Sequence, residues 1–320
     1  MNYKQLLFRF GPLLGLVFVY LLFLAISPPE FHSFYNTKTI LTQTVIIGIA
    51  ALGMTIVIIA RGIDLSVGSQ IALGTVVIAT VIQGSSGTFG MTLLAALAGI
   101  AACAICGYLI GVITARFNIV PFIVTLGMMQ IARGVAKWIA KERTVSAPEN
   151  WLQSLMLVDP EPGWMVFAPG VWITIIILII TMVLLKYTVF GRHVFAIGSN
   201  EETARLCGIR VKLNQIWIYV FCSALTGVAS IMQFSNLTVG DPTAANGMEL
   251  DIIAAVVIGG GSLNGGEGSA FGSIVGALIM AVLRNGCNML GVPNYVQEII
   301  IGSIIVGAVM VDRLKHRVKA

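Results

Sequence analysis

Charged residues are scarce in this sequence of 320 residues. Asp, Glu, Lys and Arg make up 10% of the chain, whereas hydrophobic residues make up 57% and the mean hydropathy is +0.94. A soluble domain carries roughly 25% charged residues because its surface faces water. The shortage of charge therefore excludes a soluble domain, and the apolar excess excludes a disordered chain. The class that remains is a polytopic helical membrane protein.

Side chains suited to metal, redox or nucleic-acid chemistry are equally rare. The five cysteines are an odd number, and Cys103 and Cys106 form a C-x-x-C inside an apolar run, which favours small-residue helix packing over a redox or metal site. His32, His193 and His316 have no metal-ligand spacing. Although the pI is about 9.0, no basic stripe is long enough to follow a phosphate backbone, so we expect no nucleic-acid partner.

Ten apolar stretches are predicted to be membrane helices, because a hydrocarbon core of about 30 Å needs about 20 helical residues. They are Pro12–Ile26, Ile40–Ala60, Val67–Gln83, Met91–Ala115, Val120–Ala140, Gly170–Tyr187, Gln215–Met232, Asp251–Ile258, Phe271–Leu283 and Tyr295–Val311. Lys4 and Arg9 precede the first stretch, and no small-residue cleavage site follows it, so it is interpreted as a retained span. We expect an all-α fold with about ten transmembrane helices in a single domain.

The distribution of Lys and Arg predicts that both termini lie on the cytoplasmic side. Ten crossings place both ends of the chain on one side of the membrane. Only six of the 19 basic residues fall on the other side, namely Lys38, Arg133, Lys137, Lys141, Arg143 and Arg284. Because basic residues accumulate on the inner side of membrane proteins, the bias favours a cytoplasmic N-terminus and a cytoplasmic C-terminus.

Two apolar runs about 200 residues apart are each interrupted by a polar, glycine-bearing break. Residues 54–75 and 254–275 share this pattern, and Gly68-Ser69 lies over Gly268-Ser269. Asp251–Ile258 is too short to cross a membrane alone, which predicts a broken or re-entrant element there. Paired interruptions point to a transport path, while a chance match between low-complexity stretches stays open. The pattern does not distinguish a parallel repeat from an inverted one.

Acidic residues lie in the first break and at the start of the second half of the repeat. A carboxylate between apolar spans is costly in lipid and needs a partner or water. In Gly62–Ser69 we expect Asp64 to accept hydrogen bonds from N–H groups at the start of the next helix. Two interpretations of Asp64 remain open: it caps the helix locally, or its turn also forms the inner end of a transport path. Glu249 and Asp251 form either a polar helix start or an entrance lined by acceptors.

A long loop at residues 188–213 is expected on the cytoplasmic side. Within it, Glu201–Leu206 can form a short helix with Asn200 as N-cap and Gly208 as stop. A partner surface is favoured over a solvated loop, because long ordered loops are usually functional. The glycine-rich run 259–268 contains neither Gly-Lys-Ser/Thr nor G-x-G-x-x-G, so we expect no nucleotide site in this chain.

In combination, these motifs resemble the membrane permease subunits of sugar ABC importers of the ribose permease type. The matching segments are Gly62–Ser69, Val120–Met128, residues 191–209, Glu249–Gly268, Asn285-Gly286, Gly291-Val292 and Asp312, which together extend over nearly the full chain. Arg61 stands where the family usually has glycine, and Ser199 stands where glycine is common. Gly261 and Asn264 lie at positions that vary within the glycine-rich run.

The resemblance implies one transmembrane permease domain over residues 1–320, with 188–213 as a cytoplasmic coupling loop, in the bacterial plasma membrane. It implies a second permease copy, identical or not, and a periplasmic or lipid-anchored binding protein that delivers a monosaccharide. It also implies an ATP-binding subunit that holds ATP and Mg²⁺, so this chain would have no cofactor, metal or catalytic residue of its own. The expected coupling residues are Arg192, Gly198, Asn200, Glu201, Glu202 and Arg205. The expected pathway or gate residues are Asp64, Ser66, Ser69, Glu249, Asp251 and Asn264.

Three other functions stay open. Related ABC permeases carry other solutes, such as nucleosides or branched-chain amino acids. An ion-coupled secondary transporter needs a buried acid relay, for which Asp64 and Glu298 are the only plausible carriers. A membrane enzyme needs a polar catalytic cluster, but the sequence has no His-Glu-x-x-His and no Gly-x-Ser-x-Gly.

Overall fold

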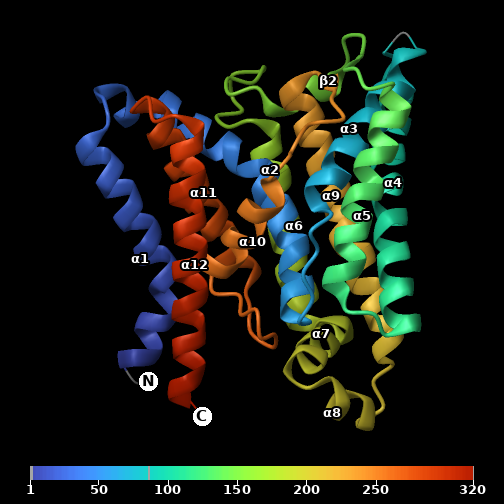
Figure 1. Ribbon diagram of the computed structural model, residues 1–320. Helices are drawn as coiled ribbons and strands as arrows, with labels where there is room; N and C mark the ends of the chain where they lie inside the picture. The colour runs from blue at the N-terminus through green and yellow to red at the C-terminus, as the bar shows by residue number, and fades with distance from the viewer. Residues whose placement is uncertain (1–2, 86, 320) are drawn as a thin grey trace.

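Helices account for nearly all of the secondary structure. The computed structural model describes the backbone of residues 3–85 and 87–319. Within these residues the helices stand side by side in one bundle, and both described ends of the chain lie at the same end of it (Figure 1). We call this the terminal end, and the opposite one the distal end. The prediction of a polytopic all-α membrane protein is confirmed.

Each of the ten predicted apolar stretches contains a helix. The helices are α1 (Tyr3–Ile26), α2 (Phe34–Ile59), α3 (Val67–Gln83), α4 (Phe89–Phe117), α5 (Pro121–Ala140), α6 (Pro169–Tyr187), α9 (Val211–Leu237), α10 (Met248–Ile258), α11 (Ala270–Met289) and α12 (Asn294–Lys319). In the described residues, α2, α4, α5, α6, α9 and α11 are long and apolar enough to span a membrane, whereas α1, α3 and α12 hold shorter apolar stretches. The number of crossings therefore stays a prediction.

The core of the bundle is formed by α2 and the helices that cross it. Nearly every side chain of α2 from Val45 to Ile59 is buried, and so is most of α3. Helices α4 and α9 pack closely because glycines leave no side chain between them. A Cβ at Gly111 would lie 2.7 Å from Cα of Ile216, and one at Gly227 would lie 2.6 Å from Cα of Ile100. Small residues at such crossings let helix backbones approach each other in a membrane.

Helices α2–α5 and α9–α12 form two sets that run in opposite directions. Each set consists of a long helix, a non-helical break, a shorter helix and two further helices. Helix α2 runs towards the terminal end, whereas α9 starts there (Figure 1). The packing partners exchange accordingly, since α3 and α4 pack on α9 while α10 and α11 pack on α2. This inverted relation is not the repeat predicted from the sequence. The predicted repeat, at an offset of 200 residues, aligns the α2–α3 turn with the α10–α11 turn, and that repeat stays a prediction.

Two features of the chain were not expected from the sequence. Residues 238–247 form a further break that enters the bundle from the distal end and leads into α10, whose 11 residues lead on to the loop 259–269 (Figure 1). The short element is therefore broken, as predicted, and it runs through the bundle instead of returning to the distal end. In addition, Val189–Ser199 is a helix, α7, within the predicted loop.

Two glycines explain why α7 was missed. Gly191 and Gly198 lower the helix propensity of the segment. Both are packed so tightly that a Cβ would collide, at Gly191 with the carbonyl of Leu185 and at Gly198 with the carbonyl of Ile59. Tertiary packing therefore overrides local propensity, and Thr188 caps the helix by accepting a hydrogen bond of 3.1 Å from the Gly191 N–H.

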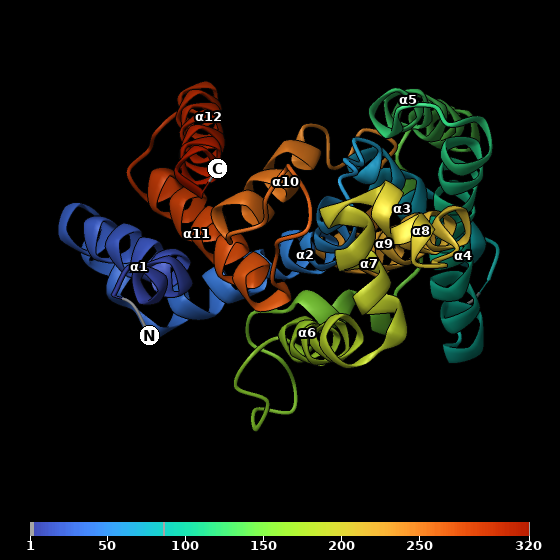
Figure 2. The same cartoon turned by 90° about the horizontal axis from the view of Figure 1, so that it is seen from below.

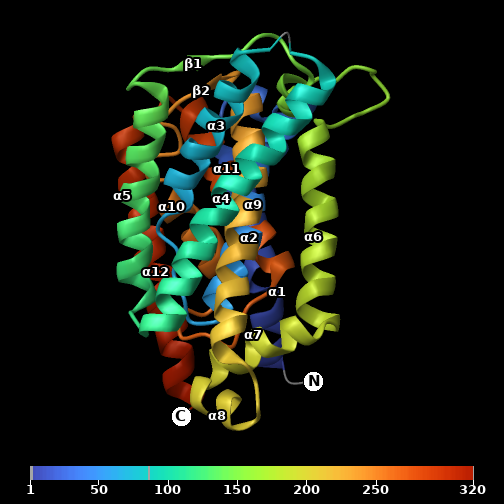
Figure 3. The same cartoon turned by 90° about the vertical axis from the view of Figure 1, so that its right-hand side faces the viewer.

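The distal end is closed by short irregular elements. Strand β1 (Val145–Ser146) pairs antiparallel with β2 (Val239–Gly240) (Figure 3). The 3-10 helix η1 (Pro29–His32) connects α1 to α2, and η2 (Trp151–Met156) packs against α9. At the terminal end, α7 and α8 (Glu201–Leu206) cover the ends of α2 and α9 (Figure 2). Some residues named in the sequence analysis have side chains outside the described part, namely Lys4, Arg9, Asp312 and His316.

Candidate transport pathway and docking surface

Asp64 lies in the non-helical stretch between α2 and α3 and is fully buried. Its Oδ1 accepts hydrogen bonds from the Ser66 N–H at 2.9 Å and from the Ser66 hydroxyl at 2.5 Å. The expected cap is thus made to Ser66, just before the helix begins at Val67. The Ser66 hydroxyl in turn accepts a hydrogen bond of 2.7 Å from the Gln70 amide. Ser69 is also buried, on the same turn of α3.

Several polar atoms of this buried group have no hydrogen-bond partner among the described residues. They are Asp64 Oδ2, Gln70 Oε1 and the hydroxyl of Tyr219, which lies against Gly62. Buried polar groups in proteins are nearly always hydrogen-bonded, and in a membrane an unpaired one is costly. The arrangement around Asp64 is therefore a site where water, a solute or a rearranged side chain would be stabilised.

The second break meets the first at the start of α3. The Glu249 carboxylate and the Ala245 carbonyl lie so close to Gly68 that a Cβ there would collide with both. Negative charge is favoured beside a helix N-terminus. The structure thus places Glu249 beside the first turn of α3, next to Gly68 and close in the chain to Ser66 and Ser69, while the role of these residues in a pathway stays a prediction.

Helix α5 holds both breaks in place. Thr125 donates a hydrogen bond of 3.2 Å to the carbonyl of Ile63 in the first break. Arg133 donates bonds of 3.0 and 2.7 Å to the carbonyls of Pro242 and Ala244 in the second. The sequence analysis counted Arg133 only as an outer charge. The available signal was its position inside a predicted apolar span, where an ionisable residue usually has a function.

Asp251 does not join this group. It lies on α10 and forms an ion pair with Arg284 of α11, with its side chain 6% exposed and that of Arg284 40% exposed. The pair faces a polar cavity of about 500 Å³ near the distal end. The polar residues that line this cavity also include Thr39, Thr42, Gln43, Gln233, Asn236, Asn246 and Asn288. Sequence reasoning missed these amides and hydroxyls because each is a single polar residue in an apolar stretch or a short turn.

The expected coupling residues lie on α7 and α8 at the terminal end. Asn200 caps α8 by accepting a hydrogen bond of 2.9 Å from the Thr203 N–H, and the helix stops at Gly208, which has a φ of +82°. Ala204 is buried against α7 and α9, whereas Leu206 is 81% exposed. The exposed members of the expected set are Arg192, Asn200, Glu201, Glu202 and Arg205. Gly198 is buried, so its role there is close packing with the end of α2.

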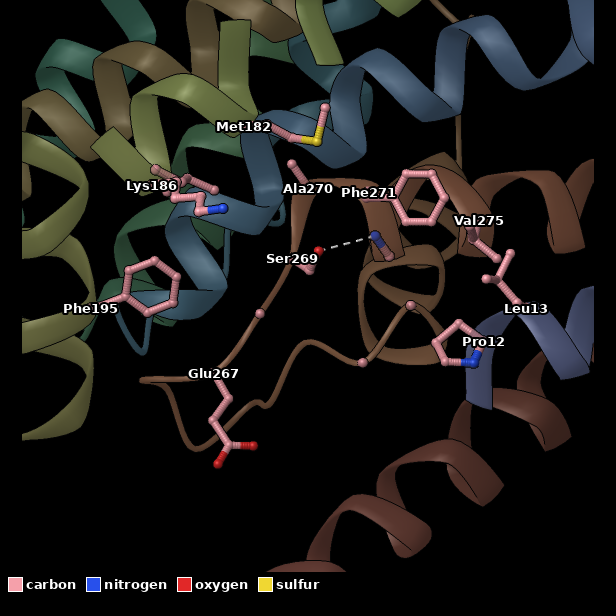
Figure 4. A pocket seen from close by; sticks show the side chains of 15 residues that line it. Pro12, Leu13, Met182, Lys186, Phe195, Glu267, Ser269, Ala270, Phe271 and Val275 are labelled. Carbon is pink, nitrogen blue, oxygen red and sulfur yellow. Dashed lines mark hydrogen bonds between the residues drawn. The ribbon is translucent and has the colours of Figure 1, made fainter. Parts of the chain in front are cut away.

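The glycine-rich loop 259–269 borders a second cavity. This cavity, of about 740 Å³, is lined by α1, α6, α7, α11 and the loop, with Lys186, Phe195 and Glu267 around it (Figure 4). Ser269 begins α11 by accepting a hydrogen bond of 3.3 Å from the Gly272 N–H. Asn264 lies in this loop, and its carbonyl accepts a hydrogen bond of 2.6 Å from Nε of Arg61, in the same stretch between α2 and α3 that contains Asp64.

Comparison with known proteins gives a consistent family. The profile of a family described as the branched-chain amino acid transport system / permease component matches residues 36–309. A ribose import permease protein of Escherichia coli K12 is 39% identical over 296 residues, covering 90% of this chain and 88% of that protein. The ribose import permease protein of Bacillus subtilis is 36% identical over 315 residues, covering 96% and 93%.

A third relative is named for L-arabinose instead of ribose. The L-arabinose ABC transporter permease protein of Azospirillum brasilense is 33% identical over 305 residues, covering 94% of this chain and 88% of that protein. No solved structure matches the chain. The profile covers most of the chain, and the helical bundle with broken elements agrees with a membrane permease. The chain therefore belongs to this family of permease components and is similar over nearly its whole length to permease proteins for ribose and L-arabinose.

Proposed function

We propose that this chain is the membrane permease subunit of an ATP-driven, binding-protein-dependent importer of a monosaccharide, and that the solute is ribose-like. The observation that carries the proposal is the identity of 39% to a ribose import permease over 90% of this chain. In this assignment the terminal end faces the cytoplasm and the distal end faces the periplasm. The predicted excess of basic residues on the inner side supports that orientation.

The cavity at the distal end supports a polyhydroxylated solute. Amide, hydroxyl, carboxylate and guanidinium groups line its polar side, and all of them exchange hydrogen bonds with hydroxyl groups. The lining offers many neutral partners and one ion pair, which suits weak binding. A conduit must release its solute, so selection belongs to the binding protein, and alternation between two states moves the solute onward.

The terminal end supports docking of an ATP-binding subunit. Leu206 presents an exposed apolar side chain on α8, flanked by Glu202 and Arg205, whose charged groups are 3.9 Å apart. An apolar anchor within a charged rim is typical of a protein interface. Because the sequence lacks a nucleotide motif, ATP and Mg²⁺ would bind to that partner. A second permease copy would complete the pathway.

The test is uptake into vesicles that contain the permease, its ATP-binding subunit and its binding protein. We expect ribose uptake that requires ATP and the loaded binding protein and that competing unlabelled ribose suppresses. Uptake that survives removal of ATP but stops when the membrane potential is abolished would instead select an ion-coupled transporter. Competition by a nucleoside or a branched-chain amino acid, but not by a pentose, would show that the solute is wrong.

The docking surface has its own test. We expect Leu206→Ser to weaken binding of the ATP-binding subunit by about thirtyfold, since a buried leucine at an interface contributes on the order of 2 kcal/mol. Charge reversal of both Glu201 and Glu202 to Lys should lower ATPase stimulation further. Cys207→Ser changes the adjacent exposed side chain and is the matched control. Unchanged stimulation and uptake in both α8 variants would contradict the assignment of this surface.

A further inference from the structure

Arg61 lies where three segments meet at the terminal end. Its Nε donates a hydrogen bond of 2.6 Å to the carbonyl of Asn264, in the glycine-rich loop. Its Nη2 donates a hydrogen bond of 3.0 Å to the carbonyl of Ser199, at the junction of α7 and α8. Arg61 itself follows the last residues of α2. One side chain therefore ties the turn after α2 to the loop and to the expected docking helices.

The backbones of the same three segments are also in direct contact. The carbonyl of Ile59, at the end of α2, accepts a hydrogen bond of 2.8 Å from the Gly266 N–H. A Cβ at Gly198 would collide with this same carbonyl, and one at Gly265 would lie 2.7 Å from the carbonyl of Gly198. With the two bonds of Arg61, these contacts form a junction that we call the clasp.

The backbone conformation of Arg61 is unfavourable for any residue with a side chain. Arg61 has a φ of +65°, a region that favours glycine and that costs another residue roughly 1 kcal/mol. The guanidinium is planar and presents several N–H donors in a fixed fork, so it can bond two carbonyls from different segments at once. A lysine ammonium is a compact point charge and does not hold two acceptors in such a fixed geometry.

The opposite flank of the loop is open. The cavity of about 740 Å³ is lined by Gly259, Gly260, Glu267 and Gly268 of the loop and by Phe195 of α7 (Figure 4). The loop can therefore shift into this space without displacing a packed core. Gly260, Gly265 and Gly266 have positive φ values, which allow backbone changes that other residues resist.

We propose that Arg61 is a positioning residue that makes α7–α8, the α2–α3 turn and the glycine-rich loop move as one unit. A displacement of α8 then reaches both broken elements at once, because α3 follows the turn and α10 precedes the loop. The proposal rests on the proposed function, since the ATP-binding subunit is what would displace α8. It assigns to Arg61 a role in coupling and not in solute contact.

The first experiment measures coupling in the reconstituted importer. Arg61→Gly removes both side-chain bonds and relieves the strained φ, so the fold should be retained. We expect uptake per ATP hydrolysed to fall about tenfold, which corresponds to the loss of about one charge-assisted hydrogen bond. Arg61→Lys should recover only part of the coupling. Arg116→Ala, which removes an exposed charge at the same end of the bundle, is the control and should match the wild type.

The second experiment reads the clasp directly. Cys207 is exposed and the other four cysteines are buried, so a spin label on Cys207 can be paired with one at Asn264→Cys. In the full complex we expect a narrow distribution of the distance between the two labels. A non-hydrolysable ATP analogue should leave it unchanged, because both labels are attached to the same rigid unit. With Arg61→Gly added, the distribution should broaden and respond to the analogue.

The outcomes separate the two proposals. A wild-type complex without ATP-dependent uptake would overturn the proposed function, whereas the label distances in the purified chain would still test the clasp. The clasp is overturned if Arg61→Gly keeps both the narrow distribution and the wild-type ratio of uptake to hydrolysis. It is also overturned if the two labels separate in the wild-type complex when the analogue binds.

Discussion

At the scale of single residues, the buried polar groups between α2 and α3 have the clearest energetic consequences. Asp64 Oδ1 serves two donors, both on Ser66. Removing an acceptor in a buried site leaves its donors unsatisfied and costs the full desolvation penalty of those groups. The local cap that the sequence predicted is thus confirmed by geometry, and its role in a pathway stays a prediction.

Two substitutions of Asp64 separate the acceptor from the charge. We expect Asp64→Ala to lower the free energy of unfolding by roughly 1 to 3 kcal/mol, because the Ser66 N–H and hydroxyl lose their partner. Asp64→Asn retains an acceptor oxygen and should cost less than half of that. Thermal unfolding of the detergent-solubilised protein measures both. Equal destabilisation by the two variants would mean that the negative charge, not the acceptor, is what the site needs.

The pair of Asp251 and Arg284 gives a second prediction at this scale. Arg284→Met leaves the carboxylate of Asp251 buried without its partner, and we expect a loss of roughly 2 to 3 kcal/mol, because breaking buried pairs costs about 3 to 5 kcal/mol and Arg284 is 40% exposed. Asp251→Asn combined with Arg284→Met should recover at least half of the loss, since no unpaired charge remains. Additive losses in this cycle would show that the two side chains are not coupled.

At the scale of elements, close packing through glycine decides how α4 and α9 cross. Gly107 and Gly111 face the backbone of α9, and Gly227 faces that of α4. The same property explains α7, whose two glycines weaken its helix propensity but permit its contacts with α2 and α6. A glycine in an apolar segment can therefore interrupt a helix or allow two helices to pack closely. Only the residues around it in the folded structure distinguish these two roles.

A pair of glycine variants tests the crossing. In Gly111→Leu the side chain would overlap the backbone of Ile216, which cannot yield as a side chain can, so we expect destabilisation of about 3 kcal/mol or more and a low yield of monodisperse protein. Gly127→Leu is the matched control, because nothing lies within 4 Å of a Cβ on that face of α5. Size-exclusion profiles and thermal midpoints compare the two. Normal behaviour of Gly111→Leu would mean that the helices do not cross so closely.

At the scale of the whole molecule, the inverted arrangement brings the breaks of the two helix sets together inside one bundle. In each set the chain has a non-helical segment before the shorter helix, and Arg133 and Thr125 of α5 hold these segments in place. Half-helices joined by extended backbone are typical of transport proteins, because they bring polar backbone groups to the interior of a membrane. Transport and the orientation of the chain in the membrane therefore depend on the whole bundle and have to be tested on it.

Labelling of single cysteines tests the orientation. Cys207 is exposed at the terminal end, and Glu161 is exposed in the segment between α5 and α6 at the distal end. With a membrane-impermeant maleimide, we expect Glu161→Cys to be labelled in spheroplasts, whose outer membrane has been removed and whose plasma membrane is intact. Cys207 should be labelled only in inside-out vesicles. Reversed accessibility of the two positions would overturn the proposed cytoplasmic location of both termini.

Composition and short motifs determined much of this protein. The shortage of charge fixed its membrane class, the apolar stretches located the helices, and the Asn200 cap and Gly208 stop located α8, because these depend on local energies. The three-dimensional arrangement decided the rest. Gly198 packs against Ile59, far earlier in the chain, and Arg133, Arg284 and Arg61 have hydrogen-bond partners about 110, 33 and 200 residues away. Contacts between residues far apart in the chain depend on how helices pack, and helices that are apolar on nearly every side carry little information in sequence about which faces meet.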